Sequence, residues 1–262
     1  MRRYLHLLRI FWGNTLATEL EYRTGFWANA GLSLFWLVWA ALGAGAYFQF
    51  APSVRGWTYN ELLVVMGLFF AINGVRQAVI QPNLARMSEY IRLGMLDFLL
   101  TKPISSQFMV SFRHVGIFNW LDPILGLGLM AVALVRRGEP VSVASLAAFA
   151  ILAVTGVAVM YAAALAVQCL AVWAIGAEGL DDLIEGMVEA GRFPVHMYRG
   201  IVRALLTFAI PVAMLTTFPA DALLGRGSWR LVGVAVAVAV VLLVATSRLW
   251  IWSLQHYTGA SS

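Results

Sequence analysis

The chain has 262 residues, of which 61% are hydrophobic and only 12% are charged. About a quarter of the residues in a soluble domain are normally charged, so this composition excludes a soluble globular protein and predicts an all-α, polytopic membrane protein. The net charge of +5 comes from 17 arginines and one lysine scattered between apolar runs. Because there is no basic block, we do not expect nucleic-acid binding and attribute the positive charge to membrane orientation.

The N-terminal segment, 1–23, begins like a signal peptide, with Arg2 and Arg3 before an apolar stretch. However, His6 and Arg9 interrupt that stretch and no small-residue cleavage site follows. Apolar residues recur at three- and four-residue steps: Leu5, Leu8, Trp12, Leu16 and Leu20. This spacing predicts an amphipathic helix lying in the membrane interface. The alternative is that these residues form the first turns of a long first span.

A helix needs roughly 20 apolar residues to cross the hydrocarbon core of a bilayer. Six segments meet or approach this length: 24–50, 60–80, 114–135, 143–175, 201–218 and 230–254. The fourth is longer than a perpendicular crossing requires, so we expect it to tilt or to extend past the bilayer. The sequence therefore predicts six transmembrane helices in a single domain, 1–262.

The distribution of arginine and lysine predicts the orientation, because these residues are enriched in cytoplasmic loops. With the N-terminus inside, thirteen basic residues lie on the inner side and five on the outer side. The inner set includes Arg192, Arg199 and Arg203; the outer set is Arg55, Arg136, Arg137, Arg226 and Arg230. The count predicts cytoplasmic termini and cytoplasmic loops at 81–113 and 176–200, although the adjacent Arg136 and Arg137 oppose the trend.

The loop 81–113 has the pattern of an amphipathic helix. In a helical projection one arc holds Leu84, Met87, Ile91, Met95 and Phe98, and the opposite arc holds Arg86, Glu89 and Asp97. Gly94 loosens the middle of this predicted helix and Pro103 sets its end. The pattern predicts a helix at the membrane interface, and the simpler interpretation is a solvated helix that only joins two spans.

The stretch RLGMLDFLLTKP at 92–103 resembles the G-x-L-D-x-x-L-x-K-P signature of the membrane subunits of type-2 ABC exporters, in the branch of small six-span permeases. Later motifs of that family also have counterparts: FPVHMY at 193–198, LTFAIP at 206–211 and FPAD at 218–221. The motifs occur in the order in which the family has them. With the six predicted spans, the resemblance covers essentially the full length.

The resemblance implies that two permeases, identical or related, pair around a substrate path in the inner (plasma) membrane. It also implies that each sits on a separate ATPase subunit, which would bind ATP and Mg²⁺, and that 81–113 carries a coupling helix that enters a groove of this ATPase. The expected ATPase-coupling surface consists of Arg86, Glu89, Arg92, Gly94, Asp97, Lys102 and Pro103. No catalytic, cofactor-binding or metal-binding residue is implied for this chain.

The chain also lacks the sequence signature of a nucleotide motor of its own. Such a motor needs a P-loop, G-x-x-x-x-G-K-[ST], whose amides and lysine hold the phosphates. The one lysine is Lys102, and Pro103 follows it. We therefore predict that the chain is not an ATPase and that a pump would require a partner subunit.

The loop 176–200 also has an amphipathic pattern. Apolar residues occupy one face of the predicted helix (Leu180, Leu183, Ile184 and Met187), and charged residues occupy the other (Asp181, Asp182, Glu185, Glu189 and Arg192). His196 lies nearby, but no spacing typical of metal ligands accompanies it. We interpret this loop as a second contact with the ATPase or the partner permease, or as a solvated face.

Three polar residues fall inside predicted spans, where such residues are costly and often functional. Arg76 lies in the inner half of the second span, Asp122 near the middle of the third, and Gln168 in the fourth. Asp122 could serve a proton- or ion-coupled carrier, which is the alternative function, or could pair with Arg76. Gln168 is typical of a hydrogen bond between helices. A membrane enzyme is the third class, but the four histidines lack a catalytic or metal-ligand spacing.

Overall fold

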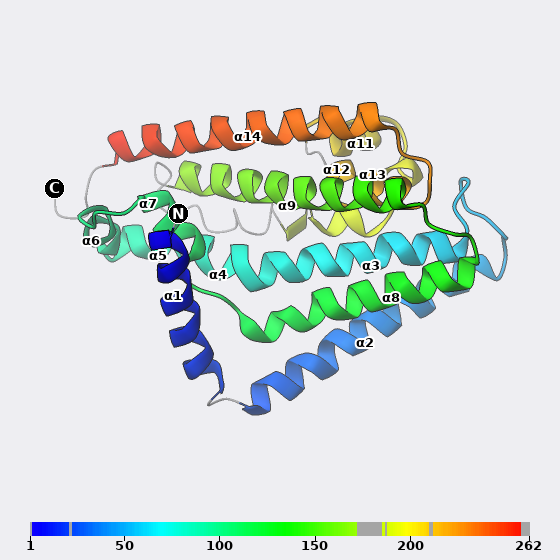
Figure 1. Ribbon diagram of the computed structural model, residues 1–262, viewed down its shortest axis with the longest axis horizontal. Helices are drawn as coiled ribbons and strands as arrows, with labels where there is room; N and C mark the ends of the chain where they lie inside the picture. The colour runs from blue at the N-terminus through cyan, green and yellow to red at the C-terminus, as the bar shows by residue number, and fades with distance from the viewer. Residues whose placement is uncertain (1, 21–22, 172–184, 187, 210–211, 258–262) are drawn as a thin grey trace.

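Four long helices lie side by side and form the body of the computed structural model (Figure 1). They are α3 (Tyr59–Val75), α8 (Leu121–Arg137), α9 (Val143–Ala171) and α14 (Trp229–Gln255). The structure describes residues 2–20, 23–171, 185–186, 188–209 and 212–257. Within these ranges there is no β-strand, only a single bridge between Val54 and Trp57. The prediction of an all-α membrane protein is confirmed.

Helix α2 (Arg23–Phe48) crosses the α3–α8 pair obliquely (Figure 1). Near its start the Asn29 side-chain amide donates to the Phe118 carbonyl, and near its end the Ala41 carbonyl accepts from the Tyr59 hydroxyl at 3.0 Å. Most other side chains of α2 are exposed. With α3, α8, α9 and α14, it gives five helices long and apolar enough to cross a membrane in the described part of the chain.

Helix α1 (Arg2–Leu20) runs across the direction of the long helices (Figure 1). Its partly buried side contacts the body through the Trp12 Nε1–H, which donates to the Phe112 carbonyl, and through the Tyr4 ring, which lies edge-on to Phe108. Because α1 and α2 point in different directions, residues 2–20 are not the first turns of the first span. The crosswise direction agrees with the predicted interfacial position, which stays a prediction.

The packing of α3 against α8 depends on glycine. A Cβ atom on Gly67 would lie 2.5 Å from the Gly126 carbonyl oxygen, and a Cβ atom on Gly126 would lie 2.6 Å from the Ala71 nitrogen. Farther along the same contact, a Cβ atom on Gly74 would lie 2.8 Å from the Pro123 nitrogen. Small residues let helix backbones approach closely in membranes, where dispersion and not the hydrophobic effect holds helices together. These glycines therefore make α3 the most buried of the long helices.

The second span begins almost where it was predicted and continues farther. A capping box starts α3: Thr58 Oγ1 accepts from the Glu61 amide, and the Glu61 carboxylate accepts from the Thr58 amide. Such a cap contributes about 1 kcal/mol. Beyond α3 the chain forms a π-helical turn (Arg76–Ile80) and a short helix, α4 (Gln81–Leu84). The span therefore leads without a break into the predicted coupling loop.

The third span begins later than predicted. A 3₁₀ turn, Ile117–Trp120, comes before α8, which starts at Leu121 and not at His114. Pro123 explains the difference: it lacks an N–H donor, so it is tolerated in the first turn of a helix and disfavoured in the middle. The prediction that Asp122 lies near the middle of the span is therefore wrong, because it lies in the first turn.

The fifth predicted span is bent. Helix α11 (Gly200–Ala204) continues into a π-helical turn (Leu205–Ala209), and α12 (Val212–Leu215) and α13 (Thr217–Leu223) follow. The helix axis bends by 58° between its two parts, Gly200–Thr207 and Val212–Leu223. By length and composition the bent pair is a sixth candidate span, but both of its ends lie at the start of α3, with Tyr198 beside Arg55 and Arg226 beside Glu61, which is the geometry of a re-entrant loop. In the sequence the break coincides with Pro211, which cannot donate a backbone hydrogen bond.

The prediction for 176–200 needs correction. Arg55, in the connection between α2 and α3, donates from Nη1 to the carbonyls of His196 (3.2 Å) and Tyr198 (3.4 Å). Residues 196–198 therefore lie at the end of the molecule opposite 81–113 (Figure 1), so this part of the predicted cytoplasmic loop does not lie on the same side as 81–113. Between these ends, the Arg192 guanidinium lies over the Phe69 ring, 5.4 Å from its centroid. Residues 188–198 thus run along α3 toward its start.

The wrong placement has a physical cause: polarity in this stretch is satisfied inside the protein. The Val195 amide donates to Thr217 Oγ1 at 3.0 Å, and Thr216 Oγ1 donates to the Gly191 carbonyl at 2.8 Å. A polar interval whose groups pair internally does not need water. Arg199 and Arg203 were assigned to the same inner side as 81–113, and they lie at the opposite end instead. Residues 176–184 lie outside the described residues.

We expect Gly126→Ala to destabilise the protein, because the added methyl group forces α3 and α8 apart. Overpacking of this kind costs about 1–3 kcal/mol, which lowers the melting temperature by about 2–4 °C per kcal/mol. Thermal unfolding of the purified protein in detergent measures the effect. Gly128→Ala is the matched control, since nothing lies within 4 Å of a Cβ atom there. Equal melting temperatures for the two variants would contradict the proposed packing.

Cysteine labelling tests the corrected topology. With Cys169 replaced by alanine, single cysteines at Phe50, Arg199 and Glu89, all exposed positions, are treated with a membrane-impermeant thiol reagent. We expect the cysteines at Phe50 and Arg199 to react from one side of the membrane and the cysteine at Glu89 to react from the other. Labelling of the Arg199 and Glu89 positions from the same side would refute the correction.

Candidate functional site

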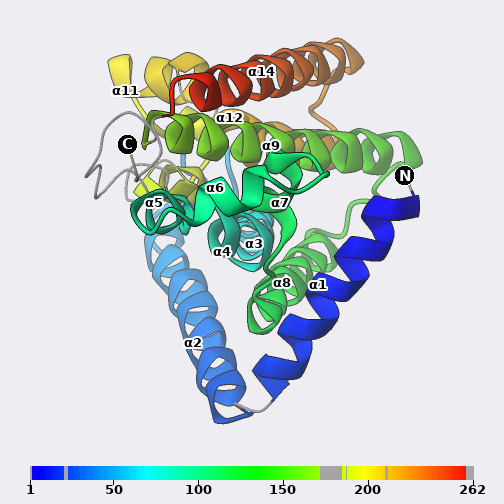
Figure 2. The same ribbon diagram turned by 90° about the vertical axis from the view of Figure 1, so that its left-hand side faces the viewer.

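The interval 81–113 folds as a row of short helices at one end of the body. After α4 come α5 (Met87–Arg92), α6 (Met95–Leu100) and α7 (Ser106–Phe112). Figure 2, which looks onto this end, shows α5, α6 and α7 in front of the end of α3. We call residues 87–100, which comprise α5, α6 and the turn between them, the α5–α6 unit. It holds most of the residues that the sequence assigned to a coupling surface.

Gly94 separates α5 from α6. Its φ of +64° is left-handed, a conformation that costs a residue with a side chain roughly 1–2 kcal/mol. The Gly94 amide donates to the Ile91 carbonyl, which closes the last turn of α5, and α6 then starts in a new direction. The predicted single amphipathic helix is therefore wrong, because the projection assumed one axis on both sides of Gly94.

The break changes which residues face the protein. Met87, Leu96 and Leu99 are buried in the core, whereas Met95 and Phe98, which the projection placed on the same apolar arc as Met87, are 42% and 66% exposed. Leu93 is exposed as well. The projection groups Met95 and Phe98 with Met87 on one apolar face, and the turn at Gly94 separates them, because Met87 packs inside the protein and the other two lie at its surface.

Charged residues of the same segment are exposed as well. Of the predicted coupling residues, Arg86, Glu89, Arg92 and Pro103 are exposed, and Gly94, Asp97 and Lys102 are half-buried. The Lys102 ammonium lies 4.8 Å from the centroid of the Phe98 ring, a cation–π contact that holds both side chains at the surface. The α5–α6 unit and the residues that flank it therefore expose apolar and charged side chains together; we call the charged ones, Arg86, Glu89, Arg92 and Lys102, the charged rim.

The side chain of Asn83 joins the two ends of the segment 81–113. Its side-chain amide donates to the carbonyls of Val79 (2.6 Å) and His114 (2.7 Å), and its Oδ1 accepts from the His114 amide (2.7 Å). The His114 ring forms a 3.0 Å hydrogen bond with the Tyr90 hydroxyl. Burial lowers the pKa of His114 to about 4, with further lowering by two nearby arginines, so the ring is neutral at pH 7. The start and end of the segment are thus joined.

Helix α7 connects this segment to two spans. Gln107 Nε2 donates to Tyr161 Oη on α9 (3.2 Å) and to Ser247 Oγ on α14 (3.1 Å). Ser111 shares a 2.8 Å hydrogen bond with the same tyrosine, and the Trp250 indole of α14 donates to Ser106 (3.2 Å). Sequence reasoning missed this polar cluster, because its members come from segments far apart in the chain. It ties α7 to both long helices.

The three polar residues predicted inside spans lie on different helices. Arg76 is buried, and its Nε donates to Asn73 Oδ1 at 2.9 Å. Asp122 Oδ1 is buried and accepts no hydrogen bond among the described residues. Gln168 is buried on α9. No shared site of all three is formed in the described part of the chain.

Arg76 instead lines a small polar cavity of about 120 Å³ beside the π-helical turn. The other residues that line it are Asn73, Gln77, Gln81, Glu185, Val188 and Glu189. Glu185 and Glu189, two residues of the acidic face predicted for 176–200, thus line this cavity. Glu189 also pairs with Arg192. Leu180, Asp181, Asp182, Leu183, Ile184 and Met187 lie outside the described residues.

Comparison with known proteins identifies the family. A model of the family described as "ABC-2 family transporter protein" matches residues 34–261. Searches among curated proteins and among solved structures found no match. The family match covers all the long apolar helices except the start of α2, together with the α5–α6 unit. The chain is therefore a multi-pass membrane protein that belongs to the ABC-2 transporter family.

Proposed function

We propose that this chain is the permease subunit of an ATP-binding cassette exporter and that a separate ATPase subunit docks on the α5–α6 unit. The observation that carries the proposal is the exposed apolar group of this unit. Leu93, Met95 and Phe98 are 57%, 42% and 66% exposed, at the end of the body and among charged side chains. Apolar groups rimmed by polar residues are typical of protein–protein contacts.

The charged rim supports specific docking and not only adhesion. Arg86, Glu89 and Arg92 are exposed in the same segment as the apolar group, and charges of both signs at a contact select a complementary partner and orient it. The half-buried Asp97 lies in the first turn of α6. Gly94 allows the turn that separates α5 from α6. These roles match the coupling surface expected from the family signature.

The hydrogen bonds of the segment provide a route for movement from the docked ATPase to the spans. The Asn83–His114 pair joins the two ends of the segment, so α4 to α7 can move as one unit. Gln107 and Ser106 then connect α7 to α9 and α14. We infer that ATP binding at the ATPase shifts this unit and, through α7, changes the packing of both long helices.

The remaining assignments follow from the same proposal. ATP and Mg²⁺ bind to the ATPase, and two permeases, identical or related, share the substrate path in the inner (plasma) membrane. Helix α2 offers a surface for the second permease or for lipid, because Trp27, Phe35, Trp36 and Trp39 are all more than half exposed. The proposed direction is export, as the family signature implies.

One observation favours a second candidate function, proton- or ion-coupled transport. Asp122 Oδ1 is buried without a hydrogen-bond partner among the described residues. However, Asp122 lies in the first turn of α8, at the end that carries the α5–α6 unit, and a carrier would place its carboxylate where both sides can reach it in turn. Transport by this chain alone in ATP-free vesicles, driven by a proton gradient and lost in Asp122→Asn, would establish this candidate instead.

We expect Phe98→Asp to weaken ATPase binding at least tenfold, because it buries an unpaired carboxylate in the centre of the proposed contact. Titration of the purified permease in nanodiscs with its cognate ATPase measures the affinity. Phe50→Asp is the matched control: Phe50 is 90% exposed but lies in the connection between α2 and α3, at the opposite end. Equal affinities for the wild type and Phe98→Asp would exclude the α5–α6 unit as the docking surface.

We expect Asn83→Ala to uncouple the two activities of the complex. The variant loses the hydrogen bonds that join the ends of the segment but leaves the exposed docking residues in place. ATPase binding and hydrolysis should persist, while the amount transported per ATP falls severalfold in proteoliposomes. Asn14→Ala, an exposed asparagine on α1, is the control. An unchanged transport-to-hydrolysis ratio in Asn83→Ala would show that this pair plays no part in coupling.

A further inference from the structure

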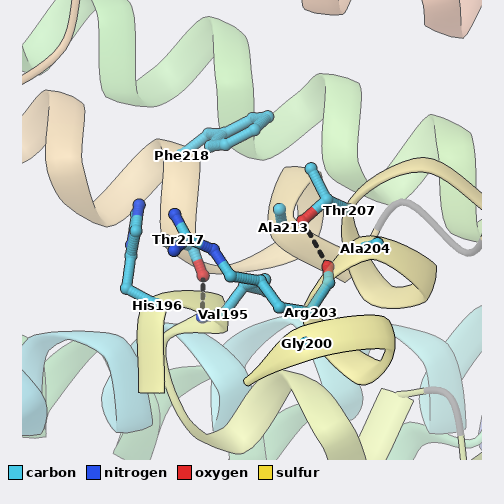
Figure 3. Close-up of a pocket in the computed structure, with 9 residues that line it drawn as sticks. All are labelled: Val195, His196, Gly200, Arg203, Ala204, Thr207, Ala213, Thr217 and Phe218. Atoms are coloured by element: carbon cyan, nitrogen blue, oxygen red, sulfur yellow. Dashed lines mark hydrogen bonds between the residues drawn. The ribbon is translucent and has the colours of Figure 1, made fainter. Parts of the chain in front are cut away.

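A cavity of about 320 Å³ lies at the end of the protein opposite the α5–α6 unit. Its lining comes from the segment before α11, from α11 and the turn after it, and from α12 and α13 (Figure 3). The apolar part of the lining consists of Val195, Ala204, Ala213 and Phe218. We call it the α11–α13 cavity. Its volume is enough for a head group and the first part of an apolar chain.

Two side chains that carry or can carry positive charge converge in this cavity. Figure 3 shows the His196 ring and the Arg203 guanidinium near each other at one side of it, with the Phe218 ring close by. Arg203 forms no ion pair with any of the described residues, and Thr207 Oγ1 donates to its backbone carbonyl, not to its side chain. The five N–H donors of this guanidinium are therefore available to a ligand.

The local charge is positive on balance. Arg55 does not line the cavity, but it donates to the backbone carbonyls of His196 and Tyr198 and so brings a further guanidinium beside the segment that carries His196. The acid that interacts with His196 is Asp221, which also interacts with Arg226 and Glu61. Glu61 in turn is held by Arg226 and Arg137. The acids of this end are thus engaged with cations, and Arg203 keeps its charge uncompensated.

The remaining polar groups of the cavity hold its walls in place. Thr217 Oγ1 accepts from the Val195 amide, which joins α13 to the segment before α11. Gly200, with φ of +55°, makes the turn from that segment into α11, and nothing lies within 4 Å of a Cβ atom there. The cavity is therefore bounded by elements that hydrogen bonds and a fixed turn position, with Arg203 directed into the space between them.

We propose that the α11–α13 cavity binds the anionic head group of an amphiphile, a phosphate or carboxylate attached to an apolar chain. Arg203 would pair with the anion in a bidentate manner, with His196 as a further donor, while Phe218 and Ala213 contact the start of the chain. The ligand can come from two sources, the transported molecule or a lipid of the outer leaflet. In the first case the inference rests on the proposed export function, and in the second it does not.

The binding test uses the purified permease alone in a neutral detergent, with radiolabelled dodecyl phosphate as the probe. We expect saturable binding that uncharged dodecanol does not compete away. Arg203→Ala should lower the affinity at least tenfold, as is typical for the loss of a charge-assisted pair, and Arg203→Lys should lower it less. Arg199→Ala is the control, because Arg199 is exposed nearby but does not line the cavity.

Two outcomes would overturn the proposal: equal affinity of the wild type and Arg203→Ala, or equal binding of dodecyl phosphate and dodecanol. Neither result involves the ATPase, so the export proposal stands even if the cavity does not bind dodecyl phosphate. Likewise, failure of the ATPase to dock on the α5–α6 unit would not affect the proposal for the cavity. The source is distinguished in a second step. Stimulation of the ATPase of the complex by dodecyl phosphate identifies a transported molecule. Phosphatidylglycerol that co-purifies with the wild type but not with Arg203→Ala identifies a lipid.

Discussion

The close contact between α3 and α8 is the constraint on which the rest of the structure depends. Gly67 and Gly126 let the two backbones touch, and Gly74 accommodates Pro123 farther along. In a membrane the hydrophobic effect does not drive helices together, so the shape of the contact decides which helices pair. Because α3 is central, its start carries the ion pairs of one end and its continuation carries the α5–α6 unit at the other.

The two ends of the molecule have different chemistry. At one end, exposed apolar side chains lie among charges of both signs, and hydrogen bonds from Asn83 and Gln107 connect them to the spans. At the other end, guanidinium groups gather around Glu61, Asp221 and the α11–α13 cavity. We propose a protein partner for the first surface and an anion for the second. The long helices join the two ends, which is the arrangement that a pump driven from one side requires.

Much of the site was recognisable from the sequence, but its geometry was not. The G-x-L-D-x-x-L-x-K-P resemblance pointed to the segment that we propose for coupling, and the structure keeps Arg86, Glu89 and Arg92 exposed there. The single continuous helix was wrong, because a helical projection assumes one axis and Gly94 adopts a left-handed conformation, which puts Met95 and Phe98 on a different face from Met87. The contacts of α7 with Tyr161 and Ser247 were out of reach, since they join residues more than 50 positions apart.

The sequence by itself determined the membrane class, the family resemblance and most of the span boundaries, because long apolar runs and local motifs need no tertiary information. Only the tertiary structure decided that residues 196–198 lie beside Arg55 and that the segment after Gly200 is bent. The physical reason is that polar groups can be satisfied either by water or by other parts of the protein, and composition does not distinguish the two. Val195 and Thr216 find their partners inside the protein, so an interval that reads as an aqueous loop packs against a span instead.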